Sequence, residues 1–170
     1  AVGTGSIHDP ARMACANKNV PLCLFATAPS MDGFASYSAP IVDGCFKITY
    51  PAKCPEVIIG DTAILAKAPV ILKSAGFGDM VSKYIAIIDW QVSALLTNES
   101  YCDKVCGLTR YAIDNLMKMA DKVTLEDEET AGAIFESLLL TGIAMSFTKT
   151  SRPGSGTEHI QAHYWECKEL

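Results

Sequence analysis

Short apolar runs bounded by turn residues dominate the first part of the chain and predict buried strands. Pro21–Ala26 and Glu56–Gly60 are runs of this kind, and they are typical of buried parallel strands. Ala1–Ser6 has the pattern of a strand that ends in a glycine-rich turn, with a short helix expected from about residue 9 or 10 to Lys18, so that Pro10 falls in its first turn. Strands that alternate with helices indicate an α/β arrangement.

Turn and capping residues predict a hairpin and a second short helix. Asp43-Gly44, between Ser38–Val42 and Cys45–Tyr50, is a strong signal for a two-residue β-hairpin. Asp61-Thr62 is placed to cap a helix over Ala63–Lys67, because such side chains accept hydrogen bonds from the first free N–H groups of a helix.

The pattern becomes helical after the two glycines of Gly76-Phe77-Gly78. Apolar periodicity predicts helices over Met80–Leu96, about Tyr101–Lys122, and Glu126–Thr148. We therefore expect an α/β part over residues 1–74 that is followed by an all-α part over residues 75–170. The chain is long enough for one good core, or for one domain and part of another.

Composition and charge argue against a nucleic-acid-binding protein and against a membrane-spanning one. The net charge is −5 and the basic residues are scattered singly, which argues against a nucleic-acid partner. The longest apolar stretches, around Val81–Leu96 and Ala131–Phe147, are interrupted by polar residues, so we expect no membrane span. The apolar helices also permit a homo-oligomer.

The cysteines point to a reducing compartment. The chain holds seven of them, an odd number, most in apolar contexts. We expect reduced thiols, most of them buried as small hydrophobic side chains, in a cytoplasmic protein.

The most distinctive polar stretch is Ser151–His163, in which a glycine- and serine-rich turn leads into a predicted helix. His159 and His163 stand four residues apart and share one helical face. This spacing fits metal or substrate binding, and it equally fits solvent-facing or structural histidines. Asp79 is an acid at the start of an apolar helix, where it could cap that helix or serve as a carboxylate partner of His159.

Two loops at the ends of predicted strands are candidates for a ligand. Gly3-Thr4-Gly5-Ser6 joins a strand to a helix, which is where α/β proteins place a pyrophosphate. Thr27–Ser36 carries several hydroxyl groups and one carboxylate, and it also fits a simple turn. The carboxyl edge of an open α/β sheet is a common binding site, which favours function for the loop Thr27–Ser36. The G-x-G pattern is too common to indicate function on its own.

Four motifs together resemble the metal-dependent sn-glycerol-1-phosphate dehydrogenases, within the superfamily of glycerol dehydrogenases, iron-containing alcohol dehydrogenases and dehydroquinate synthases. In order, the motifs are Gly3–Asp9, Thr27–Ser36, Gly76–Asp79 and Gly154–His159. The resemblance implies the C-terminal part of a Rossmann-like dinucleotide-binding domain, followed by part of a helical metal-binding domain. The implied reaction is the NAD(P)- and metal-dependent interconversion of dihydroxyacetone phosphate and sn-glycerol 1-phosphate, a step of phospholipid biosynthesis.

The resemblance also implies site residues. Asp79 and His159 would bind one divalent metal, with zinc first and nickel or iron as alternatives. The phosphorylated triose or glycerol would contact Asp32, Asp79 and His163, and the catalytic residues would be Asp79, His159 and His163. NAD or NADP would contact Gly5, Ser6, Ile7, His8, Asp9, Thr27, Ala28, Pro29, Ser30 and Ser36. From local chemistry we add Arg152, which could receive a substrate phosphate or form a surface salt bridge.

The chain departs from the family pattern at both ends. It lacks a further half-domain before Ala1, and it lacks the second metal-binding histidine expected after Leu170. We therefore expect an internal fragment that is inactive alone. A glycerol or other polyol dehydrogenase of the same superfamily, and a non-catalytic nucleotide-binding module, are the alternative functions.

Overall fold

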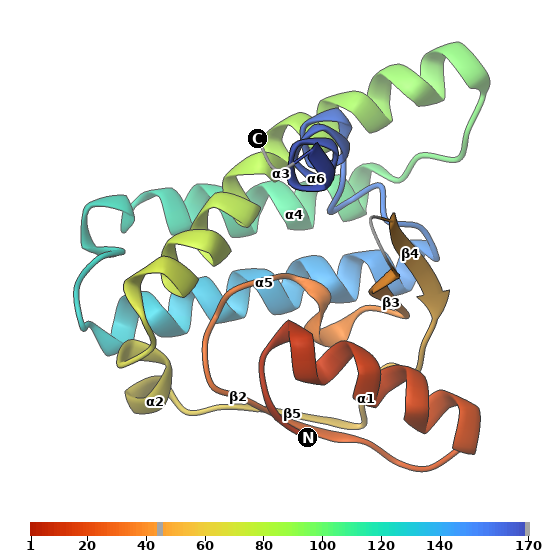
Figure 1. The fold of residues 1–170 in the computed structure, drawn as a ribbon. Coiled ribbons are helices and arrows are strands. Elements are labelled where there is room, and N and C mark those ends of the chain that lie inside the picture. Colours follow the sequence, from red (N-terminus) through yellow and green to blue (C-terminus); the bar gives the residue numbers. More distant parts are fainter. Residues whose placement is uncertain (44–45, 169–170) are drawn as a thin grey trace.

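A small parallel sheet packs beside a larger assembly of helices (Figure 1). The computed structural model describes residues 1–43 and 46–168. The sheet has the spatial order β1 (Val2–Gly3), β2 (Cys23–Ala26) and β5 (Val57–Gly60), with parallel pairing throughout. Helix α1 (Gly5–Lys18) connects β1 to β2, which gives the α/β unit expected from the sequence.

The carboxyl ends of β1 and β2 meet at one edge of the sheet. Gly3 pairs with Ala26, and the N–H of Thr27 donates to the carbonyl oxygen of Gly3 at 3.0 Å. The turn into α1 and the loop after β2 therefore leave the sheet side by side. Both candidate ligand loops therefore lie at the same edge of the sheet.

The expected hairpin is also present. Strands β3 (Ser38–Asp43) and β4 (Phe46–Pro51) pair antiparallel and contact α1. Of the predicted turn Asp43-Gly44, Asp43 is instead the last residue of β3, whereas Gly44 and the predicted strand start Cys45 lie outside the described residues. Pro10 lies inside α1, as its sixth residue, because the helix begins at Gly5, several residues earlier than the sequence predicted.

The remaining elements are helical. Asp61 caps α2, as expected, and its side chain accepts hydrogen bonds from the N–H groups of Ala63 at 3.0 Å and Ile64 at 3.3 Å. The helices are α2 (Thr62–Ala66), α3 (Val70–Thr97), α4 (Asp103–Met117), α5 (Glu128–Thr148) and α6 (Thr157–Lys168), with single 3₁₀ turns η1 (Gly33–Ala35) and η2 (Ala120–Lys122).

Helix α3 corrects the predicted helix start. It begins directly after Pro69 and runs without interruption through Gly76 and Gly78, so Asp79 lies in its interior and the capping role is wrong. The two glycines suggested a break that the structure does not have. The division at residues 74 and 75 stays a prediction, although α3 crosses it.

Helix α5 forms the middle of the core. It contacts α2, α3, α4 and η1, and it buries Ile134, Phe135 and Leu138. By length and composition α5 is apolar enough to cross a membrane, which the interrupted pattern did not suggest, but more than half of its most apolar window is buried inside the protein. Burial in the core accounts for this composition.

The thiols are more exposed than the sequence indicated. Six described cysteines are free, and Cys106 is the buried one among them. Cys23, Cys54 and Cys167 are exposed, so the expectation of mostly buried thiols is wrong.

Three glycines, two in helices and one at the end of β5, allow neighbouring segments to approach one another closely. A Cβ at Gly76 of α3 would collide with the carbonyl oxygen of Pro29, and one at Gly142 of α5 would lie 2.7 Å from the carbonyl oxygen of Asp32. A Cβ at Gly60 would collide with the Phe135 ring. Two of these contacts press α3 and α5 against the loop that follows β2.

The neighbouring glycine Gly78 provides a test of this packing. We expect Gly76→Ala to lower the free energy of unfolding by about 2 kcal/mol, because the new methyl overpacks the contact with Pro29. Gly78→Ala, where a Cβ meets nothing within 4 Å, should raise it by about 1 kcal/mol through helix propensity. Urea unfolding measures both, and equal effects would contradict the proposed role of Gly76.

Candidate active site

The predicted acid and histidine residues come together where α3, α6 and the loop Thr27–Ser36 meet. The backbone N–H of Asp32 donates to Asp79 Oδ2 at 3.0 Å, which joins the loop to α3. A Cβ at Gly154 would lie 2.7 Å from Asp32 Oδ2, so the turn before α6 also touches this carboxylate. Residues far apart in the sequence therefore share one place in the fold.

One face of α3 builds this arrangement. Asp79, Lys83, Ala86 and Asp89 follow one another at spacings of three and four, so they lie along the same side of the helix. Asp89 Oδ2 accepts from both the N–H and the hydroxyl of Thr157 at 2.6 Å, which caps α6. Ala86 is small enough for the turn at Gly156 to approach. The result fixes the start of α6 across α3, as Figure 1 shows.

Lys83 is a residue of the site that sequence reasoning missed. Its side chain is fully buried, and its ammonium lies 2.8 Å from Asp32 Oδ2 and forms a second ion pair with Asp79 Oδ1. The available signal was a lysine four residues after Asp79 in an apolar helix. Because the sequence predicted that the helix starts at Met80, Asp79 was placed outside it, and the i,i+4 spacing of Asp79 and Lys83 on one helix was missed.

The charges of this cluster shift one another's pKa values. Burial and the nearby Asp32 carboxylate raise the pKa of Asp79 to about 6, against the attraction of Lys83. Burial alone lowers the pKa of Lys83, but Asp32 and Asp79 outweigh it and hold that pKa above its ordinary value. The ammonium therefore remains charged at neutral pH.

The two histidines of α6 lie against each other. His159 Nε2 and His163 Nε2 are 3.0 Å apart, and His163 Nδ1 lies 2.7 Å from Glu166 Oε2. Burial and the charge of Lys83 lower the pKa of His159 to about 4, so its imidazole is neutral at pH 7. A neutral imidazole keeps a lone pair for a ligand.

Lys47 extends the cluster from the hairpin. Its ammonium lies 2.8 Å from His163 Nε2, the same nitrogen that faces His159. A ring nitrogen carries one hydrogen or one lone pair, so it cannot satisfy both partners. One polar group at this point is therefore available to a ligand. Nothing in the sequence of β4 signalled Lys47.

The donors available for a metal are the right types but too few. A carboxylate from Asp79 and a neutral imidazole from His159 are common ligands of divalent metals. Zinc in proteins usually has three or four protein ligands, and within residues 1–43 and 46–168 no group of three His, Cys, Asp or Glu side chains could hold a metal. This part of the chain provides at most a partial metal site.

The residues expected at the cofactor divide into accessible and buried ones. Gly5, Ser6 and Ile7 lie at the accessible start of α1, and Thr27 and Ser30 are half-buried. A Cβ at Gly5 would lie 3.4 Å from Met31 Cγ, so this helix start adjoins the loop that holds Asp32. Free N–H groups at a helix start suit a phosphate.

The other expected cofactor residues are buried. His8 is fully buried edge-on to Phe34, with ring centroids 5.6 Å apart, and burial lowers its pKa. Ala28, Pro29 and Ser36 are also buried.

A buried Arg12 binds two of these residues. Its guanidinium lies 2.6 Å from Asp9 Oδ1 and donates to the carbonyl oxygen of Ser36 at 2.7 Å and to Ser36 Oγ at 3.2 Å. Burial raises the pKa of Asp9 despite this partner. Arg12, which pairs with Asp9 of the same helix, therefore holds α1 against the loop through its bonds to Ser36.

Arg152 forms the salt bridge that the sequence left open. Its guanidinium donates to both carboxylate oxygens of Glu99, at 2.7 and 2.8 Å, and to Ser93 Oγ at 3.1 Å. These bonds occupy the planar fork that a phosphate would need. The structure supports the structural alternative for Arg152.

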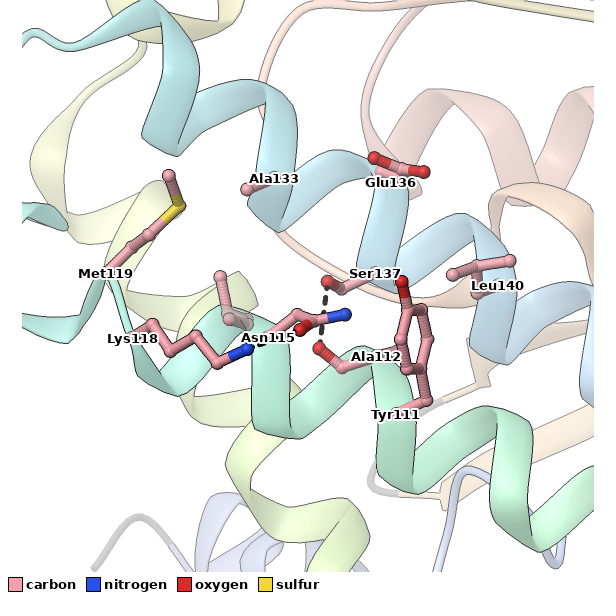
Figure 2. Close-up of a pocket in the computed structure, with 10 residues that line it drawn as sticks. Tyr111, Ala112, Asn115, Lys118, Met119, Ala133, Glu136, Ser137 and Leu140 are labelled. Carbon is pink, nitrogen blue, oxygen red and sulfur yellow. Dashed lines mark hydrogen bonds between the residues drawn. The ribbon is translucent and has the colours of Figure 1, made fainter.

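A separate cavity of about 300 Å³ lies between α4 and α5 (Figure 2). Tyr111, Asn115, Glu136 and Leu140 are among its lining residues, and Ser137 Oγ donates to the carbonyl oxygen of Ala112 at 3.4 Å beside it. None of the residues predicted for the site lines this cavity.

The pKa of His159 predicts a pH effect on stability. The imidazole of His159 has a pKa of 6.5 in the unfolded chain and of about 4 in the folded protein. Protonation therefore favours the unfolded chain, and the stabilising contribution of the neutral imidazole is lost as the pH falls from about 6.5 to 4. We expect the stability advantage of the wild type over His159→Gln to shrink by about 2 kcal/mol between about pH 7 and pH 4.5. Urea unfolding with a chelator present measures this, and a constant difference would contradict the pKa assignment.

Comparison with known proteins shows that this chain is similar to a group of enzymes. The sequence model of the iron-containing alcohol dehydrogenase family matches residues 1–69 of this chain. A glycerol-1-phosphate dehydrogenase of Halalkalibacterium halodurans, whose name gives NAD(P)+, is 39% identical over 170 residues, which are 100% of this chain and 43% of that protein. The enzyme of the same name from Methanosarcina barkeri is 36% identical over 95% of this chain and 46% of its own length. The chain thus spans less than half the length of these relatives.

Solved structures show the same fold. A probable glycerol dehydrogenase from Sinorhizobium meliloti has a TM-score of 0.72 at 21% identity, over 85% of this chain and 44% of that one. An archaeal alcohol dehydrogenase from a Red Sea brine pool has a TM-score of 0.78 at 15% identity, over 99% of this chain and 47% of that one. The resemblance is confirmed: along its whole length, the sequence of this chain is similar to those of glycerol-1-phosphate dehydrogenases.

Proposed function

We propose that the protein interconverts dihydroxyacetone phosphate and sn-glycerol 1-phosphate, with NAD or NADP as the hydride carrier. The observation that carries the proposal is that Asp32 contacts Asp79 and that the turn before the paired His159 and His163 also touches Asp32. The names of the relatives at 35–39% identity support the reaction and the cofactor. A non-catalytic module would not require this cluster, which disfavours that alternative.

The nucleotide would bind at the carboxyl edge of the parallel sheet, as the retained part of a Rossmann-like domain. The accessible N–H groups at the start of α1 would face its pyrophosphate, beside Thr27 and Ser30. Gly5, packed against Met31, brings this edge next to Asp32. The buried His8, Asp9, Ala28, Pro29 and Ser36 would then shape the cofactor site through packing and backbone position.

Asp79 and His159 would be the two donors that this chain contributes to a divalent metal, with zinc first and nickel or iron as alternatives. Such an ion polarises the oxygen on the reacting carbon of the substrate. Because two donors are too few, we propose that residues 1–170 alone bind metal poorly and show no turnover.

The chain's own side chains would place the substrate. The Asp32 carboxylate, held by Lys83, would accept hydrogen bonds from a substrate hydroxyl. His163 Nε2 would contact a substrate oxygen, while Glu166 fixes the ring through Nδ1. Reduction of the ketone needs a hydride at carbon and a proton at oxygen, so a polar group positioned at that oxygen is required.

A substrate phosphate would be received by Lys47. Its ammonium is exposed on β4 and lies against His163, whereas the guanidinium of Arg152 is bonded to Glu99. A compact cation binds phosphate as a point charge. An unphosphorylated glycerol or polyol substrate remains the second candidate, because structures of similar fold are named glycerol dehydrogenases.

The exposed free thiols fit a reducing environment, and we propose a cytoplasmic location on this ground. A homo-oligomer is compatible with the exposed apolar side chains of Leu95, Leu96 and Phe147.

The reaction is tested by NADH or NADPH oxidation with dihydroxyacetone phosphate. We expect a full-length protein that contains residues 1–170, unlike these residues alone, to turn over this substrate, to lose activity with a chelator, and to recover it with zinc or nickel. His159→Ala and Asp79→Asn should each reduce kcat/KM by about a hundredfold or more, because each removes a proposed metal donor. Faster turnover with glycerol or dihydroxyacetone would favour the polyol alternative.

The phosphate assignment is tested by a matched pair of variants. Lys47→Ala should raise KM for dihydroxyacetone phosphate by about tenfold, with a smaller change for dihydroxyacetone, because dihydroxyacetone has no phosphate for the ammonium to bind. Arg152→Ala should chiefly lower stability, through loss of the link to Glu99. A phosphate-specific rise in KM in Arg152→Ala, with none in Lys47→Ala, would reverse the assignment.

A further inference from the structure

Lys83 is a fully buried cation placed between two carboxylates of the candidate site. Its ammonium lies 2.8 Å from Asp32 Oδ2 and pairs with Asp79 Oδ1. The side chains of Asp32 and Asp79 are themselves only 16% and 15% exposed. A buried charge without partners is strongly destabilising, and two buried carboxylates side by side repel each other. Each of the three groups therefore depends on the other two.

The role of Lys83 differs from that of the other buried lysine in the described chain. Lys73 is 2% exposed, and its ammonium donates to the carbonyl oxygens of Ala66 at 2.9 Å and Leu125 at 2.6 Å. Lys73 thus ties the end of α2 to a turn, as a structural donor. The ion-pair partners of Lys83 are instead the two carboxylates that are proposed to contact substrate and metal.

Both oxygens of Asp79 are already engaged. Oδ1 pairs with Lys83, and Oδ2 accepts from the N–H of Asp32. A metal ion that binds Asp79 must share or replace one of these partners. The positive charge of Lys83 would also repel a divalent cation in a site of low dielectric.

We propose that Lys83 is a positioning residue whose ammonium serves as the counter-ion of Asp32 and Asp79 and holds both carboxylates in place. The same ammonium competes with a divalent metal for the carboxylate of Asp79. The proposal rests on the metal role proposed above for Asp79. Lys83 keeps Asp32 oriented toward the substrate, and it limits the affinity of the site for metal.

Loss of the competing ammonium and loss of folded structure change the affinity for a divalent cation in opposite directions. Removing the ammonium should tighten binding of a divalent cation, because two carboxylates then lack a counter-ion. A variant that merely loosened the fold would bind the cation more weakly. The sign of the change therefore separates the two explanations.

The experiment is calorimetric titration with Ni²⁺ of the full-length protein that contains residues 1–170, after treatment with a chelator. We expect Lys83→Met to lower the Kd for Ni²⁺ by about tenfold or more. Lys73→Met, which removes a buried ammonium bonded to carbonyl oxygens, should leave the Kd within about twofold of the wild type. Exposed thiols are common to all variants, so their contribution cancels. If Lys83→Met does not fold, Lys83→Gln replaces it, because it keeps a hydrogen-bond donor without the charge.

Unchanged or weaker Ni²⁺ binding in the Lys83 variant would overturn the proposal, as would equal tightening in Lys73→Met. NADH or NADPH oxidation with dihydroxyacetone phosphate is measured on the same preparations. Turnover by the wild type without tightening in Lys83→Met would reject the role of Lys83 and leave the reaction standing. Tightening without turnover would reject the reaction and leave the role of Lys83 standing.

Discussion

The close approach of α3 and α5 to the loop Thr27–Ser36 is the constraint on which the candidate site depends. Gly76 and Gly142 carry no side chain where these helices meet the loop backbone, so the helices press directly on Pro29 and Asp32. From the other side, Arg12 of α1 bonds Ser36, and Ser146 Oγ of α5 donates to the carbonyl oxygen of Ala35 at 2.6 Å. A loop fixed from three helices can hold a carboxylate at a defined position, which catalysis requires.

Charged contacts also hold the loop Thr27–Ser36 in the position that the close packing gives it. The N–H of Asp32 donates to Asp79, and the carboxylate of Asp32 pairs with the ammonium of Lys83, so the loop and α3 are joined by backbone and side chain at once. Burial and the same ammonium lower the pKa of His159 on α6. One buried lysine therefore links the geometry of the carboxylates to the neutral state of the imidazole. The low dielectric of the site makes these effects strong.

Local signals in the sequence predicted most of the elements because those signals act over a few residues. Asp61 caps α2, the apolar runs form β2 and β5, and the Gly/Ser turn leads into α6 as expected. The start of α3 was predicted wrongly because Gly76 and Gly78 weaken a helix locally. Gly76 lies in the helix for a tertiary reason, the contact with Pro29, which no window of neighbouring residues contains.

The partners of polar side chains were harder to predict than the side chains themselves. Asp79 and His159 were found from their motifs, but whether they share a place depends on how α6 crosses α3, which Ala86 and Asp89 decide. Arg152 is bonded to Glu99, which stands 53 positions away, and Lys47 reaches His163 across 116. The same sequence could have left Arg152 free and Lys47 in solvent if the hairpin or α3 had packed differently. The identity of a charged residue limits its chemistry, and only the fold selects between a salt bridge and a ligand contact.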